Sequence, residues 1–210
     1  MSVGLSSTTL QQIENHLVSS GYIVLHQHIA CAFIQQLAHH IHALSQSKQL
    51  QSAQIGKQNN HIFNSEIRGD NTRWLQSQSD NLHEQIYLGM MDQLRQHLNQ
   101  TLFLGLQAFE CHYALYPIGA RYQKHLDQFK DDDLRQISAI LYLNQDWKTE
   151  DGGALRLYLT ENETPFLDVW PEAGTLVIFL SERFYHEVLP AKRERISITG
   201  WLRRKAHYTL

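Results

Sequence analysis

Three residues of this sequence have the side-chain types of a metal site. His125 and Asp127 are separated by one residue, so in a strand their side chains would project from the same face. His186 is the candidate for a third ligand from a distant segment. Two histidines and one carboxylate on one face of an octahedron leave three positions open, an arrangement typical of Fe(II) oxygenases. A catalytic zinc site can use the same ligands, so the residues alone leave the metal undecided.

The His-x-Asp spacing has little weight by itself. The chain contains 13 histidines, and composition alone predicts about 0.6 chance occurrences of this spacing. A purely structural role for His125 is therefore an open alternative.

Arg195 gives the three candidate ligands a context. It begins the run Arg195–Trp201, which predicts a strand with Arg195, Ser197 and Thr199 on one face. If that face lines the interior, the guanidinium is buried and needs an anionic partner. A carboxylate fits its planar fork, and the distal carboxylate of 2-oxoglutarate is such a group. The alternative is an exposed arginine on an edge strand, among other basic residues.

The first half of the chain is predicted to be helical. Apolar residues recur at three- and four-residue intervals in Leu10–Leu17, Ile29–Leu44 and Leu82–Leu102. Gly21 ends the first helix, and Tyr22–Leu25 is predicted to be a short strand. These predicted helices are expected to pack against the part of the fold that carries the candidate site.

The second half has the pattern of short strands separated by glycine- and proline-containing turns. The predicted strands are Ala139–Leu143, Ala154–Tyr158, Thr175–Leu180 and Ile196–Leu202. Helices followed by strands indicate an α+β fold, with the strands in a sandwich or barrel. Residues 47–70 are polar and aperiodic, which is typical of a functional or mobile loop.

Composition narrows the class of protein. A chain of 210 residues suits one domain. The net charge of −3 and the lack of a basic stripe argue against nucleic-acid binding. Two cysteines without CxxC spacing argue against a disulfide framework and a thiolate zinc site. Because neither a signal peptide nor a membrane-spanning run is evident, we predict a cytoplasmic protein without a membrane partner.

Several motifs together resemble a known family. They are Ile67–Asp70, Tyr116-Pro117, His125–Asp127, Tyr142–Trp147, Gly152–Arg156, His186–Val188, Arg195 and Trp201. Their order and spacing are similar to those of the hypoxia-sensing type of prolyl 4-hydroxylase, in particular its bacterial relatives, over Ser47–Arg204. The resemblance implies one Fe(II)/2-oxoglutarate oxygenase domain over residues 1–210. Its core would be a double-stranded β-helix (jelly roll) at about 104–210, supported by helices at about 1–103.

The resemblance also implies roles for individual residues. The iron ligands would be His125, Asp127 and His186. The co-substrate 2-oxoglutarate would contact or lie near Arg195, Tyr142, Tyr116, Tyr122 and Thr199. The substrate would contact Arg135, Trp201, Arg68 and Asp70, with the loop at 47–70 closing over it. Two purely structural alternatives stay open. Tyr142 and Trp201 could be aromatic residues of the core, and Arg68 and Asp70 could form a local ion pair in a loop.

The implied activity is hydroxylation of a prolyl residue in a protein, which gives hydroxyproline, succinate and CO2. Fe(II), 2-oxoglutarate and O2 would be required, ascorbate is a candidate further cofactor, and a translation elongation factor is a candidate substrate. One alternative is an oxygenase acting on another side chain or a free amino acid. Another is a sensor module that binds metal and 2-oxoglutarate without turnover.

Overall fold

Three α-helices are present in the computed structural model, which describes residues 4–53, 66–128 and 133–205. They are α1 (Ser7–Ser19), α2 (Cys31–Gln46) and α3 (Leu82–Leu102). Side chains cap two of them: the Ser6 hydroxyl accepts from the Thr9 N–H at 3.1 Å, and Asn81 Oδ1 accepts from the first turn of α3. The predicted helices are therefore confirmed to within a few residues.

The strands form two antiparallel sheets. The major sheet has the order β1 (Tyr22–Leu25), β9 (Leu176–Leu180), β6 (Arg135–Tyr142), β11 (Arg195–Arg204), β4 (Leu106–Tyr116), β3 (Asn71–Trp74) and β2 (Gln51–Ser52). The minor sheet has the order β5 (Tyr122–His125), β10 (His186–Val188), β7 (Leu155–Tyr158) and β8 (Phe166–Val169). A short 3-10 helix, Thr149–Asp151, precedes β7.

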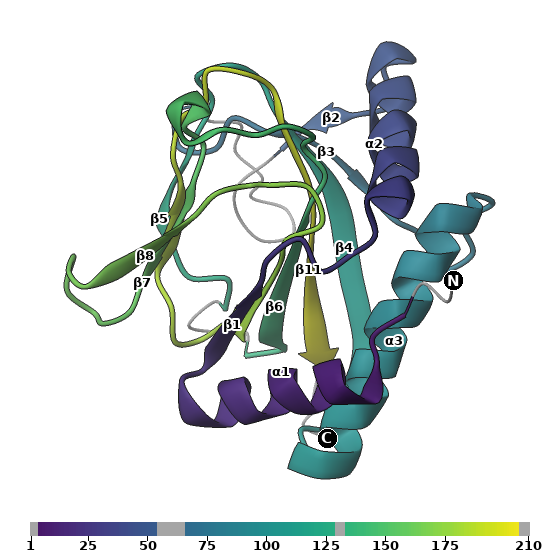
Figure 1. Ribbon diagram of the computed structural model, residues 1–210, viewed down its shortest axis with the longest axis vertical. Coiled ribbons are helices and arrows are strands. Elements are labelled where there is room, and N and C mark those ends of the chain that lie inside the picture. The colour runs from purple at the N-terminus through teal and green to yellow at the C-terminus, as the bar shows by residue number, and fades with distance from the viewer. Residues whose placement is uncertain (1–3, 54–65, 129–132, 206–210) are drawn as a thin grey trace, which may run out of the picture.

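The central strands of the major sheet are buried on both faces. In β4, Tyr113 and Leu115 pack with the helices, whereas Ala114 and Tyr116 pack with the minor sheet. The alternation of side chains along a strand thus gives the sheet two apolar cores. Figure 1 shows the result: α2 and α3 lie on one side of the major sheet, and β5, β7 and β8 lie on the other. The predicted α+β class is confirmed.

The sequence patterns differ from the structure in several places, and strands β4, β8 and β10 were not predicted. The first half of the chain contributes β2 and β3 to the major sheet, although only β1 was expected there. Strand β5 ends at His125, so Asp127 lies two residues beyond the strand and not within it. Part of the predicted loop at 47–70, residues 54–65, lies outside the described residues. No helix in the ranges described is long and apolar enough to cross a membrane.

Asn144 ties the loop after β6 to the beginning of β11. This side chain is 4 % exposed. Its Nδ2 donates to the carbonyls of Pro171 (2.7 Å) and Ile196 (3.0 Å), and its Oδ1 accepts from the Ile196 N–H at 2.6 Å. Buried backbone groups need such partners. The hydrogen bonds therefore fix the backbone next to Arg195.

Replacing Asn144 with alanine is expected to lower the free energy of unfolding by about 2–4 kcal/mol, because three hydrogen bonds to buried backbone groups are lost. Urea unfolding followed by circular dichroism would measure the change, with an unaltered m-value. Asn15→Ala is the control, since Asn15 is an exposed residue of α1 and should cost no more than about 0.5 kcal/mol. Equal losses for the two variants would contradict this account of Asn144.

Candidate active site

His125, Asp127 and His186 meet at the edge of the minor sheet. His125 ends β5 and His186 begins β10, and the two residues are direct partners in the antiparallel pairing of these strands. One ligand atom from each of the three side chains lies within 4.8 Å of the others. Asp127 is 3.7 Å from His125 Nε2 through Oδ1 and 3.5 Å from His186 Nε2 through Oδ2. Two distant segments thus converge on one point that suits a cation.

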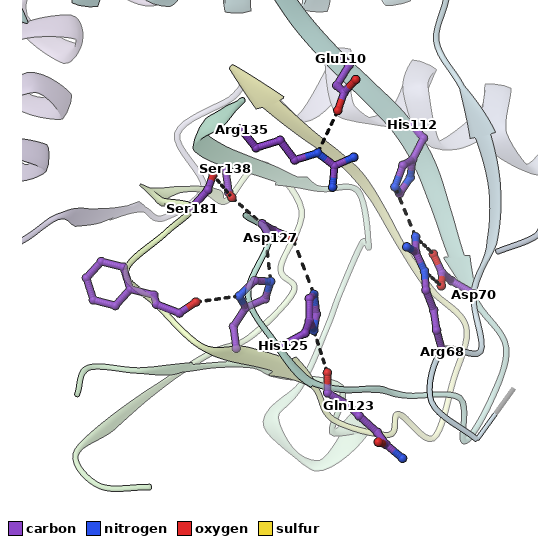
Figure 2. Close-up of polar contacts among 12 residues, drawn as sticks. Arg68, Asp70, Glu110, His112, Gln123, His125, Asp127, Arg135, Ser138 and Ser181 are labelled. Atoms are coloured by element: carbon purple, nitrogen blue, oxygen red, sulfur yellow. Dashed lines mark hydrogen bonds and ion pairs between the residues drawn. The ribbon is translucent and has the colours of Figure 1, made fainter. Parts of the chain in front are cut away.

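Backbone carbonyls orient both imidazoles. His125 Nδ1 lies 2.7 Å from the Gln123 carbonyl, and His186 Nδ1 lies 3.1 Å from the Phe184 carbonyl. In each ring Nδ1–H therefore donates, and the Nε2 lone pair is left for a ligand. Figure 2 shows this for His125, with Gln123 on one side of the ring and Asp127 on the other.

The Ser138 hydroxyl orients the carboxylate. It donates to Asp127 Oδ2 at 2.6 Å and is itself 2.8 Å from the Ser181 hydroxyl (Figure 2). These second partners, which the sequence patterns did not identify, come from β6 and from the residue after β9. They fix the carboxylate before any cation binds.

The protonation states also suit a cation. Burial by itself would raise the pKa of Asp127, but His186, His125 and the Ser138 hydroxyl hold that pKa well below its usual range. Burial lowers the pKa of His186 to about 4, so its imidazole is neutral near pH 7. An ionised carboxylate and a neutral imidazole are the forms that bind metal ions.

Arg195 is a buried cation near the triad. It is 2 % exposed, and its Nε donates to the Gly153 carbonyl at 2.9 Å. Within the described part of the chain, no acidic side chain forms an ion pair with it. Gly153 has a φ of +72°, and a Cβ there would lie 2.8 Å from Ala191 Cβ and 3.4 Å from Arg195 Cδ. Glycine at this turn therefore permits the positive φ and leaves the space that Ala191 needs, while its carbonyl accepts from Arg195.

Tyr142 provides an unpaired hydroxyl beside that cation. The Arg195 Cζ lies 5.0 Å from the ring centroid of Tyr142 and 5.2 Å from that of Tyr116. Among the described residues the buried Tyr142 hydroxyl has no hydrogen-bond partner. Burial raises the pKa of Tyr142 to about 12, although Arg195 acts to lower it, so the hydroxyl remains a donor. A buried cation and a free donor together suit a carboxylate of a bound acid.

One cleft of about 800 Å³ contains most of the residues that the sequence singled out. The predicted site residues that line it are His125, Asp127, His186, Arg195, Tyr116, Tyr122, Thr199, Arg68, Arg135 and Trp201. Tyr142 lies behind the wall, next to Arg195, and Asp70 lies behind Arg68. The predicted inward face of β11 is confirmed, because Arg195 and Thr199 line the cleft while Ile196 and Ile198 pack toward the helices.

Arg68 and Asp70 form a bidentate ion pair in the wall of the cleft. Their atoms are 2.7 Å apart for Nε–Oδ1 and 2.9 Å for NH2–Oδ2, and Asp70 is 2 % exposed. The guanidinium lies over the Tyr122 ring, 4.8 Å from its centroid. Tyr122 in turn stacks on the His125 ring at 3.7 Å. The pair is thus local in sequence but is connected through contacts to a candidate metal ligand.

His112 and Trp74 are cleft residues that the sequence reasoning missed. His112 Nδ1 donates to the Tyr113 carbonyl at 3.1 Å, which leaves Nε2 to accept from Arg68 NH2 at 3.4 Å. Burial, reinforced by Arg68, lowers the pKa of His112 to about 4. Its ring centroid lies 5.0 Å from that of Trp74 and 5.6 Å from that of Trp201. The sequence contains a signal for His112. Side chains alternate along a strand, so His112 lies on the same face of β4 as Tyr116, which was a predicted site residue.

Comparisons with known proteins agree with this geometry. The family model described as "2OG-Fe(II) oxygenase superfamily" matches residues 111–203. A prolyl-4-hydroxylase structure from Pseudomonas putida is 43 % identical, with a TM-score of 0.83, over 94 % of this chain and 100 % of that one. A prolyl hydroxylase from Trichoplax adhaerens, solved with a hypoxia inducible factor peptide fragment, is 26 % identical with a TM-score of 0.82, over 94 % and 93 % of the two chains.

Curated relatives include longer proteins. Egl nine homolog 1 from Homo sapiens is 31 % identical over 173 residues, which are 80 % of this chain and 40 % of that protein. The hypoxia-inducible factor prolyl hydroxylase from Caenorhabditis elegans is 34 % identical over 149 residues, which are 67 % of this chain and 20 % of that protein. The chain thus spans less than half the length of these two relatives.

The arrangement of sheets and helices matches the double-stranded β-helix of the prolyl hydroxylases, as the motifs predicted. The donor set and the buried cation fit Fe(II) and 2-oxoglutarate respectively. The chain belongs to the 2OG-Fe(II) oxygenase superfamily and is an oxygenase of the prolyl hydroxylase type, which uses Fe(II), 2-oxoglutarate and O2.

Proposed function

We propose that this oxygenase hydroxylates a prolyl residue of a protein substrate, with hydroxyproline, succinate and CO2 as products. The observation that carries the proposal is the buried guanidinium of Arg195, which lies in the same cleft as the triad and has no acidic partner among the described residues. A site for an acid co-substrate and a site for a metal therefore share one chamber. The cleft of about 800 Å³ leaves room beyond them for a segment of a second protein.

His125, Asp127 and His186 would hold Fe(II). When bound, the iron with 2-oxoglutarate and O2 supplies the oxidising chemistry, which belongs to the cofactor and not to the chain. The chain's part is to direct both Nε2 lone pairs toward one point and to keep the carboxylate ionised. The carbonyls of Gln123 and Phe184 do the first by accepting from Nδ1–H. The two imidazoles and the Ser138 hydroxyl do the second.

Arg195 and Tyr142 would bind the distal carboxylate of 2-oxoglutarate. The guanidinium neutralises the carboxylate charge and the Tyr142 hydroxyl donates a further hydrogen bond. Thr199 lines the cleft on the same strand as Arg195, Tyr116 is the register partner of Arg195 on β4, and Tyr122 lines the cleft from β5. These side chains would exclude water from the co-substrate.

The protein substrate would bind against the wall that contains Trp201, Arg135, Arg68 and, behind it, Asp70. Support comes from the Trp201 indole N–H, which is buried without a partner in the described ranges and could donate to a substrate carbonyl. The 26 % identical Trichoplax enzyme was solved with a peptide fragment of a protein. A translation elongation factor is the candidate substrate, the cytoplasm the expected location, and ascorbate a candidate reductant.

The direct test is to incubate the purified protein with Fe(II), labelled 2-oxoglutarate and chromatographic fractions of a dialysed bacterial lysate. One fraction should stimulate succinate release and gain one oxygen on a proline, as seen by mass spectrometry. The small molecules removed from the lysate are tested separately. If they alone stimulate succinate release, the substrate is instead a free amino acid or another small molecule. Binding of 2-oxoglutarate without any succinate would indicate a sensor.

His125→Ala should reduce succinate release to about one hundredth of wild type or less, because a metal ligand is lost. Its affinity for Fe(II), measured by calorimetry without oxygen, should fall as well. His39→Ala is the matched control, since His39 is an exposed histidine of α2 and should leave both quantities unchanged. Wild-type turnover by His125→Ala would show that the site assignment is wrong.

Tyr142→Phe should raise the KM for 2-oxoglutarate by about fivefold, as expected for the loss of one hydrogen bond of about 1 kcal/mol. Tyr87→Phe is a close control, because the Tyr87 hydroxyl is also buried without a partner among the described residues but lies in the helix-side core. That variant should keep the wild-type KM. A similar KM for the two variants would remove Tyr142 from the co-substrate site.

A further inference from the structure

Glu110 lies outside the cleft, yet it holds part of the cleft wall. Arg135 Nε donates to Glu110 Oε1 at 2.9 Å, and Arg203 donates to the other carboxylate oxygen of Glu110. Arg135 and Trp201 line the cleft, whereas Glu110 and Arg203 do not. Figure 2 shows Arg135 extending over the sheet toward Glu110, apart from the triad and from the pair of Arg68 with Asp70.

The strand order explains the shape of this contact. Glu110 is on β4 and Arg135 is on β6, with β11 between the two strands. Glu110 is the register partner of Trp201, and Arg135 is the register partner of Arg203. To reach the carboxylate, the Arg135 side chain must therefore cross β11, and its Cζ lies 3.6 Å from the centroid of the Trp201 ring.

A partly buried ion pair can restrict a long side chain in this way. The side chains of Arg135 and Glu110 are 22 % and 23 % exposed, so water screens their attraction less than at an open surface. An arginine has many rotamers in solution, and fixing them when a substrate binds costs free energy. A carboxylate that fixes the guanidinium beforehand reduces that cost.

We propose that Glu110 is a positioning residue for protein-substrate recognition: it holds the Arg135 guanidinium on the face of Trp201, so that this wall of the cleft is formed before the substrate arrives. The inference rests on the proposed function, in which Arg135 and Trp201 contact the substrate. It adds a residue of β4 that touches neither substrate nor cofactor.

The chain has a matched control for this arrangement in the minor sheet. Arg156 donates to Asp168 at 2.8 Å from both Nε and NH2, and its Cζ lies 4.0 Å from the Phe166 ring centroid. The two side chains are 26 % and 24 % exposed. This trio also joins an arginine, a carboxylate and an aromatic ring, and its charged pair is about as exposed as Arg135 and Glu110. Its ring, Phe166, is exposed, whereas Trp201 is buried. None of its members lines the cleft.

The kinetic test compares Glu110→Gln with Asp168→Asn, using the lysate fraction that stimulates succinate release as the probe. Glu110→Gln should raise the half-saturating concentration of that fraction by about tenfold, as for the loss of one well-aligned charged contact. It should leave the KM for 2-oxoglutarate and the substrate-independent turnover unchanged. Asp168→Asn should change none of these quantities.

Coupling to Arg135 separates positioning from a general structural effect. Arg135→Ala should also raise the half-saturating concentration, and adding Glu110→Gln to it should cause no further rise. An unchanged value for Glu110→Gln, a rise equal to that of Asp168→Asn, or full additivity with Arg135→Ala would each overturn the inference. If Arg135→Ala itself has no effect, the proposed substrate role of Arg135 fails, and the inference fails with it.

A second readout needs neither substrate nor turnover. In a nitrogen-15 NMR spectrum, the Arg135 Nε–H signal is identified by its absence from Arg135→Ala. Its hydrogen exchange should become at least about tenfold faster in Glu110→Gln, because the hydrogen bond to Oε1 is weakened. Unchanged exchange would show that Glu110 does not hold this guanidinium, whatever the fate of the proposed function.

Discussion

The central strands of the major sheet are packed on both faces over most of their length. One set of alternating side chains in β4, β6, β9 and β11 packs against the helices, and the other set packs toward the minor sheet. Successive side chains of a strand point to opposite faces of the sheet. A strand can therefore turn polar side chains toward a cleft on one face while apolar side chains on the other face pack in the core. Arg195, Thr199 and Trp201 occupy the second set of β11, while Ile196 and Ile198 anchor the first. A slip of one residue in this strand would put the guanidinium into the helix-side core.

Burial on that face determines the electrostatics of the site. Arg195 and Asp127 are charged groups that are 2 % and 5 % exposed, and such groups are costly without partners. Two imidazoles and the Ser138 hydroxyl surround the carboxylate. Among the described residues, the guanidinium has the Gly153 carbonyl and the rings of Tyr142 and Tyr116 beside it, but no carboxylate. The unfolded chain would hydrate both charges fully. The fold therefore keeps two binding sites ready at some cost to its own stability, which the bound ligands would offset.

Two arginines of the cleft are each held by a carboxylate, and the two pairs differ in kind. Arg68 and Asp70 are two residues apart and form a bidentate pair within one loop. Arg135 and Glu110 come from strands that are not neighbours. Trp201 lies on β11, the strand between those two, and its ring packs against the Arg135 guanidinium. The first pair depends on local chain geometry, whereas the second depends on the register of three strands. Changes in strand register would therefore affect the cleft wall at Arg135 more than the cleft wall at Arg68.

The sequence by itself determined the helices, most of the central strands and the residues that could bind a metal and an acid. Those features are local: helical spacing, alternation along a strand and ligand chemistry are all visible in short segments. It did not determine that Asp127 lies beyond the end of β5, that β2 and β3 extend the major sheet, or that Ser138, His112 and Glu110 support the site. These depend on contacts between residues far apart in the chain. The order of β4, β11 and β6 brings Glu110 within hydrogen-bond distance of Arg135, and the packing of Arg68 against β4 does the same for His112. Strand register is fixed by packing and not by any one segment.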